Sequence, residues 1–598
     1  MFNFIFKKAL NDINLSNSKK VDFSKNNQGI GPFLALYTVF KLLEQRKINF
    51  EDIVVVNETA IKEKGKGIVG YQLGDQLSLF QVLVNYKITS GVDSLFLLSN
   101  HVFLKTQKKM SDYFIEIINE NNLSENCAKN LSGKSNSKLN QDYNLEDVLT
   151  ISELFSKINP FYLNILSESK TYFKGKIFLA QSYLLDLNKI TYFFDFLNIS
   201  VSWKIEQNKV FSYVVTQGVE NSFQQDSLIE RVFLDEKINF LSSDFLQVDA
   251  DIKKSNAIIN LIGDTYLGEY YSARRSKRKD FFDPLINHGY SYSFGKLEIF
   301  LHHADINIAN HEACFINQSI QSPLIGLKKF ILGADDEKTI TALEKANIKY
   351  LSLANNHTAD YGEDGISHTL EILNKHNIKN FGAGLNELDA CKPLRVKING
   401  RVISFYAGYW HRATNQKIFK FYATPSEPGV ATLESILTES IKAEKTFYPD
   451  HTIIVLSHWG VDFLPTQNYQ KHLANKLIQC GADLIVGHGA HALQSIEDHK
   501  GKTVLYSIGN GIFNSDGEYE GYPDAMPFGM IAQLNFDNSN MSLKLFPIDS
   551  NNRETMWQPD FVNLEQFAVV QDYYSSFNFD SVNTSEWPFY FEKRIINF

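Results

Sequence analysis

The sequence predicts an α/β and α+β fold with two domains. From residue 256 onward, apolar segments alternate with helical patterns in the order strand, loop, helix, which is typical of βαβ units. Residues 1–235 mix helical patterns with a β-hairpin and lack this repeat. The 598 residues, 44% of them hydrophobic and 21% charged, are enough for more than one packed core.

Four segments follow from these patterns. Residues 1–235 form the first predicted domain, and the more polar stretch 236–255 is expected to be a linker. Residues 256–550 form the second predicted domain. The aromatic-rich tail 551–598 is expected to pack onto the fold, because it is too apolar to stay solvated.

Helical periodicity in the first domain predicts helices over 33–48, 77–88 and 110–122. The segment "IVVVNETA" (53–60) is predicted to be a strand and turn, and 199–218 a hairpin that turns at "EQNK". Residues 119–145 are polar and rich in Asn, Ser and Lys, which indicates a mobile loop.

In the second domain, seven apolar segments are predicted to contain strands, and six of them end in a polar or glycine cluster. The segments are 256–264, 297–312, 348–357, 402–411, 452–460, 482–491 and 503–511. Open α/β sheets carry their chemistry at the carboxyl ends of the strands. The side chains of these clusters are therefore expected to meet at one edge.

The composition excludes several classes of protein. A formal net charge of −9 is mild for this length and does not point to nucleic acid. The four cysteines form no C-x-x-C pair, so they are expected to be reduced thiols. No stretch reaches the roughly 20 apolar residues of a membrane span, and "MFNFIFKKAL" is too short for a signal-peptide core. We therefore expect a soluble, cytoplasmic protein.

The stretch "LANNHTADYGEDG" (353–365) follows a predicted strand and precedes a helix predicted over 365–378. Asn356 can bind a metal there, and Asn355 can contact a substrate. His357 with Asp360 can form an acid with its orienting carboxylate, which would set the tautomer of the imidazole. The structural alternative is a helix-capping turn, which Asn and Asp also favour.

The strand-end clusters together predict a divalent metal site. Its expected ligands are Asp264, Glu312, Asn356, His458, His488 and His491. Imidazole and carboxylate suit Mn, Fe or Zn, and two such ions can clamp an attacking and a leaving oxygen. Singly, each residue has a structural alternative: Asp264 as a turn, His458 as a core histidine, and the pair His488 and His491 as a chance H-x-x-H match.

The basic run "ARRSKRKD" (273–280) follows Asp264 closely. Arg274 and Arg275 can attract a polyanionic substrate such as polyglutamate or phosphate. The alternative is a solvated, charged loop, because runs of charge are usually at the surface.

The segments "INLIGDTYLG", "ADINIANHE", "LSLANNHTADYGEDGISHTLEIL", "NFGAGLNELDACKP", "VLSHWGVDF", "GADLIVGHGAHALQSIE" and "VLYSIGNGIF" resemble the CapA family in order and spacing. Members of this family are linked to capsule and poly-γ-glutamate synthesis. The resemblance implies a calcineurin-like metallophosphoesterase fold, a four-layer α/β/β/α sandwich. It also implies that the six ligands surround the metals and that His357 lies near the leaving group. Asn510 would contact either a metal-binding side chain or the substrate.

Two positions depart from the pattern of general metallophosphoesterases, and a third departs from the pattern of the CapA family. Their Asp-x-His is here Asp264 followed by Thr265 and Tyr266, and Asn310-His311-Glu312 stands in place of Gly-Asp. The family's His-His-Pro-His is here His488-Gly489-Ala490-His491, which keeps the outer histidines. With these departures, the site is expected to hold either one metal ion or two.

Residues 29–102 resemble the core of serine D-Ala-D-Ala carboxypeptidases and class A β-lactamases. The Ser-x-x-Lys of those enzymes aligns with Gly29 and Pro32, and their Ser-x-Asn aligns with Ser90-Gly91-Val92. Their Lys-Thr-Gly aligns with 189–191 or 170–172, both without the glycine. The N-terminal domain is therefore expected to be an inactive, transpeptidase-like domain, and penicillin labelling is expected to be negative.

The resemblance implies a metal-dependent hydrolase that acts in the synthesis of capsule, poly-γ-glutamate or another cell-envelope polymer. A metal-activated water would attack a phosphoester or an amide-type bond. The alternative is a non-catalytic factor that binds the polymer or serves as a scaffold. The expected partners are an anionic envelope polymer or its precursor and a polymer synthase. The family context favours the cell envelope over the cytoplasm.

Overall fold

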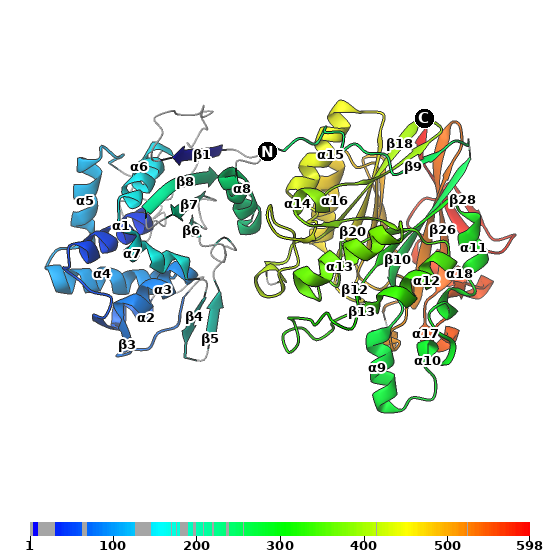
Figure 1. The fold of residues 1–598 in the computed structure, drawn as a ribbon, viewed down its shortest axis with the longest axis horizontal. Coiled ribbons are helices and arrows are strands. Elements are labelled where there is room, and N and C mark those ends of the chain that lie inside the picture. Colours follow the sequence, from blue (N-terminus) through cyan, green and yellow to red (C-terminus); the bar gives the residue numbers. More distant parts are fainter. Residues whose placement is uncertain are drawn as a thin grey trace. The chain divides into compact units, whose positions relative to one another are not determined.

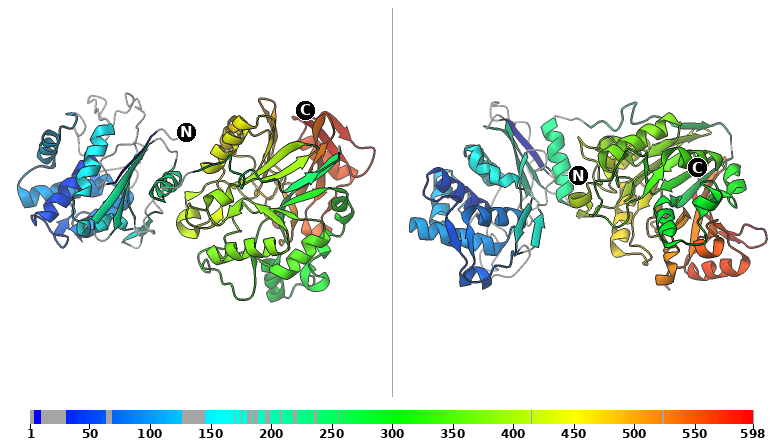
Figure 2. Two further views of the ribbon diagram at one scale, coloured as in Figure 1. Left: turned by 45° about the horizontal axis from the view of Figure 1, so that its top comes forward. Right: turned by 60° about the horizontal axis from the view of Figure 1, so that its bottom comes forward.

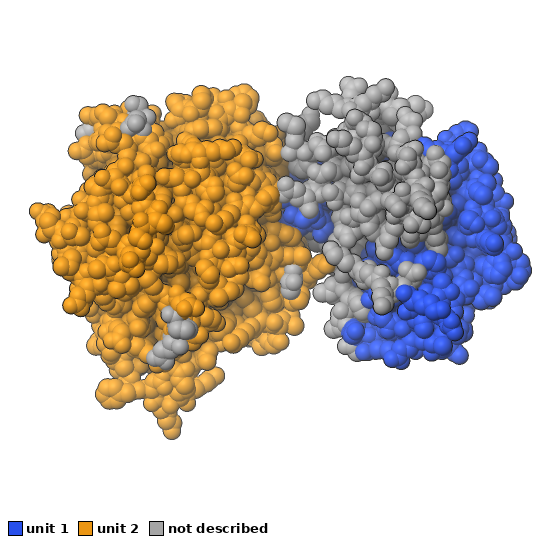
Figure 3. Space-filling model, turned by 180° about the vertical axis from the view of Figure 1, so that it is seen from behind, with its two compact units in different colours: residues 1–237 blue, residues 238–598 orange. Residues whose placement is uncertain are grey.

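The computed structural model describes residues 4–9, 30–62, 68–125 and 145–597, apart from 169, 175, 180–183, 185–188, 195–198, 207–208, 218–220, 235–237, 255, 414 and 523. The chain divides into two compact units, unit 1 (Met1–Lys237) and unit 2 (Ile238–Phe598), as Figure 3 shows. Most of the predicted loop 119–145 lies outside the described residues.

Unit 1 combines helices with an antiparallel sheet. Its helices are α1 (Gly31–Glu44), α2 (Glu58–Lys62), α3 (Leu79–Thr89), α4 (Val92–Thr106), α5 (Met110–Glu120), α6 (Leu145–Ser156), α7 (Pro160–Leu163) and α8 (Ser222–Leu234). Its strands are β1 (Phe4–Ala9), β2 (Ile53–Val55), β3 (Gln76–Ser78), β4 (Lys170–Phe173), β5 (Lys176–Leu179), β6 (Lys189–Phe194), β7 (Ile199–Glu206) and β8 (Lys209–Gln217). The main sheet has the order β1-β8-β7-β6, which confirms the hairpin predicted over 199–218.

The core of unit 1 forms around α1, which is buried along most of its length. Phe33 of α1 stacks on Phe155 of α6, with 4.6 Å between the ring centroids. Trp203 of β7 lies in the same cluster and donates from Nε1 to the carbonyl of Ser152 at 3.2 Å. Helices and sheet therefore share one apolar core.

Unit 2 is built on two sheets. Its strands are β9 (Ala250–Ile252), β10 (Ala257–Tyr266), β11 (Ile306–His311), β12 (Cys314–Ile316), β13 (Gly333–Asp335), β14 (Tyr350–Ser352), β15 (Lys379–Phe381), β16 (Ala383–Gly384), β17 (Leu394–Ile398), β18 (Arg401–Tyr409), β19 (Gly429–Val430), β20 (Thr452–His458), β21 (Leu484–His488), β22 (Ile496–His499), β23 (Lys502–Leu505), β24 (Asn510–Phe513), β25 (Phe528–Phe536), β26 (Asn540–Asp549), β27 (Asp560–Phe561), β28 (Ser581–Asn583) and β29 (Tyr590–Asn597). Its helices are α9 (Glu269–Arg278), α10 (Pro284–His288), α11 (Glu298–His303), α12 (Asp336–Lys345), α13 (Gly362–Lys375), α14 (Glu387–Ala390), α15 (Ile436–Phe447), α16 (Asn468–Cys480), α17 (Asn552–Thr555) and α18 (Leu564–Tyr573).

The two sheets pack face to face, as Figures 1 and 2 show. One sheet has the order β15-β14-β11-β10-β25-β26-β29-β28, with β24 beside β10 and β27 beside β26, and the other β22-β23-β21-β20-β18-β17-β9. Leu261 and Ile308 of the first sheet share a buried cluster with Phe405 and Val486 of the second. This inter-sheet core is the centre of the unit.

Helices cover the outer faces of both sheets. α15 and α16 pack on the seven-stranded sheet through a buried cluster that includes Leu437 and Leu477. α12 and α13 have buried apolar faces and lie on the outer side of the ten-stranded sheet, because its inner face is occupied by the other sheet. Unit 2 is therefore an α/β/β/α sandwich, as the resemblance implied.

Both ends of unit 2 take part in its sheets. Within the predicted linker 236–255, β9 pairs in parallel with β17, so this stretch ends in a strand of the fold. In the tail 551–598, β29 pairs with β26, and Phe591 stacks on Phe567 with 4.6 Å between the ring centroids. The edge strand β9 and the tail strands were not expected from the sequence.

Glu269, the first residue of α9, is half-buried, and its carboxylate lies close to Asp335, Lys338 and Tyr290. Its Oε1 accepts hydrogen bonds from the backbone N–H of Asp335 at 3.0 Å and from Thr339 Oγ1 at 3.2 Å. Burial nevertheless raises the pKa of Glu269 to about 7 from an ordinary value of 4.5. Ionisation of Glu269 therefore costs the folded protein stability near neutral pH.

Replacing Glu269 by Gln is expected to stabilise unit 2 only at higher pH. A folded-state pKa above the unfolded value means that stability is complete below about pH 4.5 and is lost as the pH rises through about 7. Glu269→Gln removes this loss, so its thermal unfolding temperature should match the wild type near pH 4.5. It should exceed the wild type near pH 8 by an amount that corresponds to about 2–3 kcal/mol. An equal difference at both pH values would contradict this explanation.

Candidate metal centre

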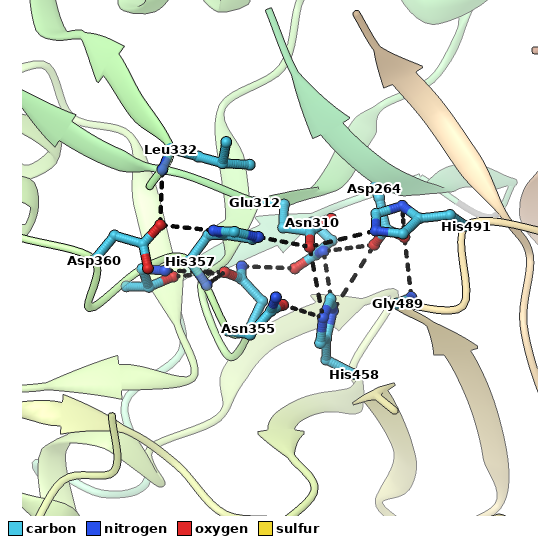
Figure 4. A network of polar contacts seen from close by, with 12 residues as sticks. Asp264, Asn310, Glu312, Leu332, Asn355, His357, Asp360, His458, Gly489 and His491 are labelled. Atoms are coloured by element: carbon cyan, nitrogen blue, oxygen red, sulfur yellow. Dashed lines mark hydrogen bonds and ion pairs between the residues drawn. The ribbon is translucent and has the colours of Figure 1, made fainter. Parts of the chain in front are cut away.

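The carboxyl ends of the parallel strands meet at one edge of unit 2, and all six predicted metal ligands lie there. Asp264 is near the end of β10, beside Asn310 of β11, and His458 of β20 is beside His488 of β21. Figure 4 shows most of the network that these residues form with their neighbours. Strand order and register thus bring together residues that are up to 227 positions apart, from Asp264 to His491.

Asp264 lies at the centre of the cluster. Its Oδ1 is 3.4 Å from His488 Nδ1, and its Oδ2 is 3.3 Å from His491 Nδ1. Asn310 Nδ2 donates to Oδ1 at 2.8 Å, and the N–H of Gly489 donates to Oδ2 at 3.0 Å, which holds the carboxylate in place. Burial alone would raise the pKa of Asp264, but the hydrogen bond with His488 and the charges of His491 and His458 hold that pKa below its ordinary value.

Two groups of side chains share this carboxylate. Asp264 with His458 and His488 forms one group, and Asp264 with Glu312 and His491 forms the other. In each group the ligand atoms lie within 4.8 Å of one another. Carboxylate and imidazole in this arrangement can hold two divalent ions with a common ligand.

The carboxylate of Glu312 is buried without a compensating partner among the described residues. Both of its carboxylate oxygens are buried without a hydrogen-bond partner among the described residues. Its Oε1 faces the Nε2 atoms of His357, His458 and His491 at 3.9, 3.8 and 3.7 Å, which is too far for hydrogen bonds. Burial raises the pKa of Glu312 well above its ordinary value. A cation among these atoms would satisfy the carboxylate, so the residues fit a metal.

The histidines support the same conclusion. His458 Nδ1 and His488 Nδ1 lie 2.9 Å apart, and His488 Nε2 has no hydrogen-bond partner among the described residues. Asn356 Oδ1 lies 2.7 Å from His458 Nε2, so the amide oxygen also points into the site. Burial lowers the pKa of His458 well below its ordinary value, which keeps its ring neutral and able to bind a metal.

The loop after β21 has the backbone that this site requires. Gly489 has φ +97°, and a Cβ on it would come within 2.9 Å of the His458 ring, so only glycine fits. His491 has φ +56°, a left-handed conformation that directs its ring toward Asp264 and Glu312. Against the effect of burial, the neighbouring carboxyl groups of Glu312 and Asp264 raise the pKa of His491 above its ordinary value.

His357 and Asp360 lie beside the ligands. His357 Nδ1 is 2.6 Å from Asp360 Oδ2, and its Nε2 faces Glu312. Lys328 forms an ion pair with Asp360, donates to the carbonyl of Asn356 at 2.6 Å, and lies 3.2 Å from His357 Nδ1. Burial and the charge of Lys328 lower the pKa of His357.

Asn355 is not placed to contact a substrate, contrary to the expectation from the sequence. Its Nδ2 donates to Asn310 Oδ1 at 3.1 Å and to the carbonyl of His311 at 2.8 Å. Its Oδ1 accepts from the N–H groups of His357 and Thr358. Because these bonds use the whole amide, Asn355 holds the turn, as the capping alternative describes.

Arg275 is not available to a substrate either. It is buried on the inner face of α9, where Nε donates to Asp283 at 2.7 Å and Nη1 donates to Asp516 at 2.9 Å. Arg274 is exposed on the same helix, with its guanidinium 5.7 Å from the Tyr270 ring centroid, and its role toward a substrate stays a prediction. Asn510 Oδ1 lies 2.8 Å from His491 Nδ1, so Asn510 is placed to orient the His491 ring.

Two residues that contact the candidate site were not identified from the sequence. Asn310 fixes Asp264, and its place after a strand, next to His311 and Glu312, was the only available signal. Lys328 lies in "GLKKF", where nothing separates a buried lysine from a solvated one. His311 is buried and stacks on Phe315 with 4.3 Å between the ring centroids, and burial lowers its pKa to about 3.

In unit 1, Pro32 lies in the first turn of α1, and Ser90-Gly91-Val92 joins α3 to α4. Gly29 lies outside the described residues. Gly29 and Pro32, which align with the serine nucleophile and the lysine, cannot replace them, because glycine and proline carry no reactive side-chain group.

Among the described residues, no helix is both long and apolar enough to span a membrane.

The sequence of unit 2 is similar to known proteins. Residues 258–515 match the family model described as "Bacterial capsule synthesis protein PGA_cap". The PGA biosynthesis protein CapA of Bacillus subtilis is 33% identical over 181 residues, 30% of this chain and 46% of that protein. The capsule biosynthesis protein CapA of Bacillus anthracis is 27% identical over 268 residues, 44% of this chain and 62% of that protein. The chain spans about half the length of the curated relatives it matches.

Solved structures that resemble the chain are penicillin-binding proteins and carboxypeptidases. Penicillin binding protein 5 of Haemophilus influenzae has a TM-score of 0.33 at 15% identity, over 43% of this chain and 76% of that chain. The D-alanyl-D-alanine carboxypeptidase DacD of Francisella tularensis has a TM-score of 0.33 at 11% identity, over 39% and 69% of the two chains.

Proposed function

We propose that this chain, whose residues 258–515 match the family model of bacterial capsule synthesis proteins, is a metal-dependent hydrolase in the synthesis of an envelope polymer. Capsule material and poly-γ-glutamate are the polymers that the names of its relatives suggest. The bond cleaved is a phosphoester or an amide-type bond in the polymer or its precursor. A polymer synthase is the partner that this role requires.

The unpartnered carboxylate of Glu312 is the observation that carries the proposal. A buried carboxylate without hydrogen bonds is costly unless a cation satisfies it. Glu312 faces three imidazole Nε2 atoms. It also forms a group with Asp264 and His491 that could hold a metal ion. From this constellation we infer a site that binds and uses a metal.

The side chains have distinct roles in this proposal. Asp264, Glu312, Asn356, His458, His488 and His491 would hold Mn, Fe or Zn. The chemistry that such a cation supplies is activation of a water and polarisation of the bond to be cleaved. Asp360 holds Nδ1 of His357, so His357 exchanges a proton with the reacting groups through Nε2.

The test is hydrolysis by protein reloaded with Mn or Zn, on a phosphodiester and on a γ-glutamyl peptide. We expect the wild type to cleave one substrate class and Asp264→Asn to lose this activity. In His357→Gln, kcat should fall by about 10²–10⁴-fold. Asp251→Asn, an exposed residue of β9, is the matched control and should keep full activity. No cleavage of either class by metal-loaded protein would contradict the proposal.

One observation favours the non-catalytic alternative. Tyr266 stands where general metallophosphoesterases have a metal-binding histidine, and its buried hydroxyl donates to the carbonyl of Gly333 and accepts from the N–H of Tyr270. If the site holds two ions, this chain therefore supplies one histidine ligand fewer than general metallophosphoesterases do. Metal-loaded protein that binds polyglutamate without cleaving any tested bond would identify a polymer-binding or scaffold factor.

A further inference from the structure

The segment Glu269–His288, here called the α9–α10 hairpin, projects from the edge of unit 2 that carries the metal centre. α9 begins three residues after β10 ends, and Figure 1 shows the helix and its following loop extending away from the body at the bottom of the view. Phe281 in this loop is 102% exposed, so no other described part of the chain covers its ring. α10 adds Ile286, which is 66% exposed.

The base of the hairpin is firmly packed. Arg275 links α9 to Asp283 at the start of α10 and to Asp516 of the body, and its guanidinium lies 5.1 Å from the Trp557 ring centroid. Arg278 pairs with Asp280 and Asp516 at 2.6 and 2.9 Å. The exposed ring of Phe281 is therefore presented by an anchored element.

The exposed surface of the hairpin is basic although the chain is acidic. Arg274, Lys277 and Lys279 are exposed, and the one exposed carboxylate of the segment, Asp280, is already paired with Arg278. The whole chain has a formal net charge of −9, so the positive charge of this hairpin is opposite in sign to that of the chain. A basic surface around an exposed aromatic ring suits the interface of an anionic membrane.

We propose that the α9–α10 hairpin docks unit 2 on an anionic lipid surface, with Phe281 inserted at headgroup level and the basic side chains against lipid phosphates. A soluble polyanion would satisfy the charges but would leave the Phe281 ring in water. A lipid surface satisfies both. Docking would bring the metal-bearing edge within roughly one helix length, about 15 Å, of the membrane. The proposal holds whether or not the metal centre is catalytic.

The test is flotation of the full chain with vesicles of phosphatidylcholine alone and with equal parts of phosphatidylcholine and phosphatidylglycerol. Phe281→Ser removes the apolar contact, and Ile299→Ser on α11, whose side chain is 75% exposed, is its matched control. Lys277→Glu/Lys279→Glu reverses the charge, and Lys345→Glu/Lys349→Glu, also exposed, is the control for charge. Thermal unfolding of each variant verifies its folding.

We expect wild type and both controls to float only with the anionic vesicles, and to be released by high salt. Phe281→Ser should weaken binding roughly tenfold or more, and the charge reversal roughly a hundredfold. Failure of the wild type to float, or binding by Phe281→Ser equal to that of the wild type, would overturn the proposal. Binding of soluble polyglutamate that depends on Lys277 and Lys279 but not on Phe281 would identify a polymer site instead.

Discussion

Replacing Glu312 by Gln is expected to stabilise the metal-free protein and to abolish its response to metal. In the absence of a cation, both carboxylate oxygens are buried without a hydrogen bond from any described residue, and burial raises the pKa of Glu312. Removing the charge should therefore raise the free energy of unfolding of chelated protein by about 1–3 kcal/mol. Gln is a poor metal ligand, so the rise in unfolding temperature that Mn or Zn causes in the wild type should disappear.

Glu444→Gln is the matched control for this prediction. Glu444 is also a buried carboxylate, but it accepts hydrogen bonds from Arg395, Ser404 and Tyr406 and contacts His451. Against the effect of burial, His451 and Arg395 lower the pKa of Glu444 to about 2. Glu444→Gln should destabilise unit 2 by about 3–5 kcal/mol, with or without metal. If Glu312→Gln also destabilises the chelated protein, the explanation of its unpartnered carboxylate is wrong.

Replacing Lys328 by Met is expected to destabilise unit 2 strongly. The Nζ of Lys328 is the cation that pairs with the fully buried carboxylate of Asp360, and it also donates to the carbonyl of Asn356. Loss of one partner from a buried ion pair leaves an uncompensated charge, which costs about 3–5 kcal/mol. Unfolding by guanidinium chloride, followed by fluorescence, measures the loss.

The double variant Lys328→Met/Asp360→Asn separates charge from packing. It removes both members of the pair, so it should regain at least half of the stability lost in Lys328→Met. The amide introduced by Asp360→Asn keeps the shape of the carboxylate beside His357 and the N–H of Leu332. A double variant less stable than either single variant would show that the ion pair is not the source of the effect.

The strand ends of unit 2 were predictable because each signal is local. An apolar run followed by Asp, Asn or His marks a strand and its carboxyl end, and parallel order then brings Asp264, His458 and His488 to one edge. The pairing of two sheets into a sandwich came from the family resemblance. The sequence patterns alone contain no information about which strands become neighbours.

The residues that were misassigned or missed depend on tertiary contacts. Arg275 occupies the buried face of α9, and only Asp283 and Asp516, brought in by the fold, distinguish it from exposed Arg274. Asn355 is satisfied by Asn310 and His311 from a neighbouring strand. Lys328 reaches Asp360 from a loop 32 positions away, and no periodicity predicts such a contact.

Metal content is the most direct test of the central claim, that the strand-end cluster of unit 2 is a metal centre. Purified wild type is compared by mass spectrometry with His488→Ala/His491→Ala and with His302→Ala/His303→Ala, an exposed pair on α11. We predict stoichiometric Mn, Fe or Zn in the wild type and in the α11 variant, and its loss in His488→Ala/His491→Ala. Wild type that holds no metal even after reloading, or a site variant that keeps it, would contradict the account.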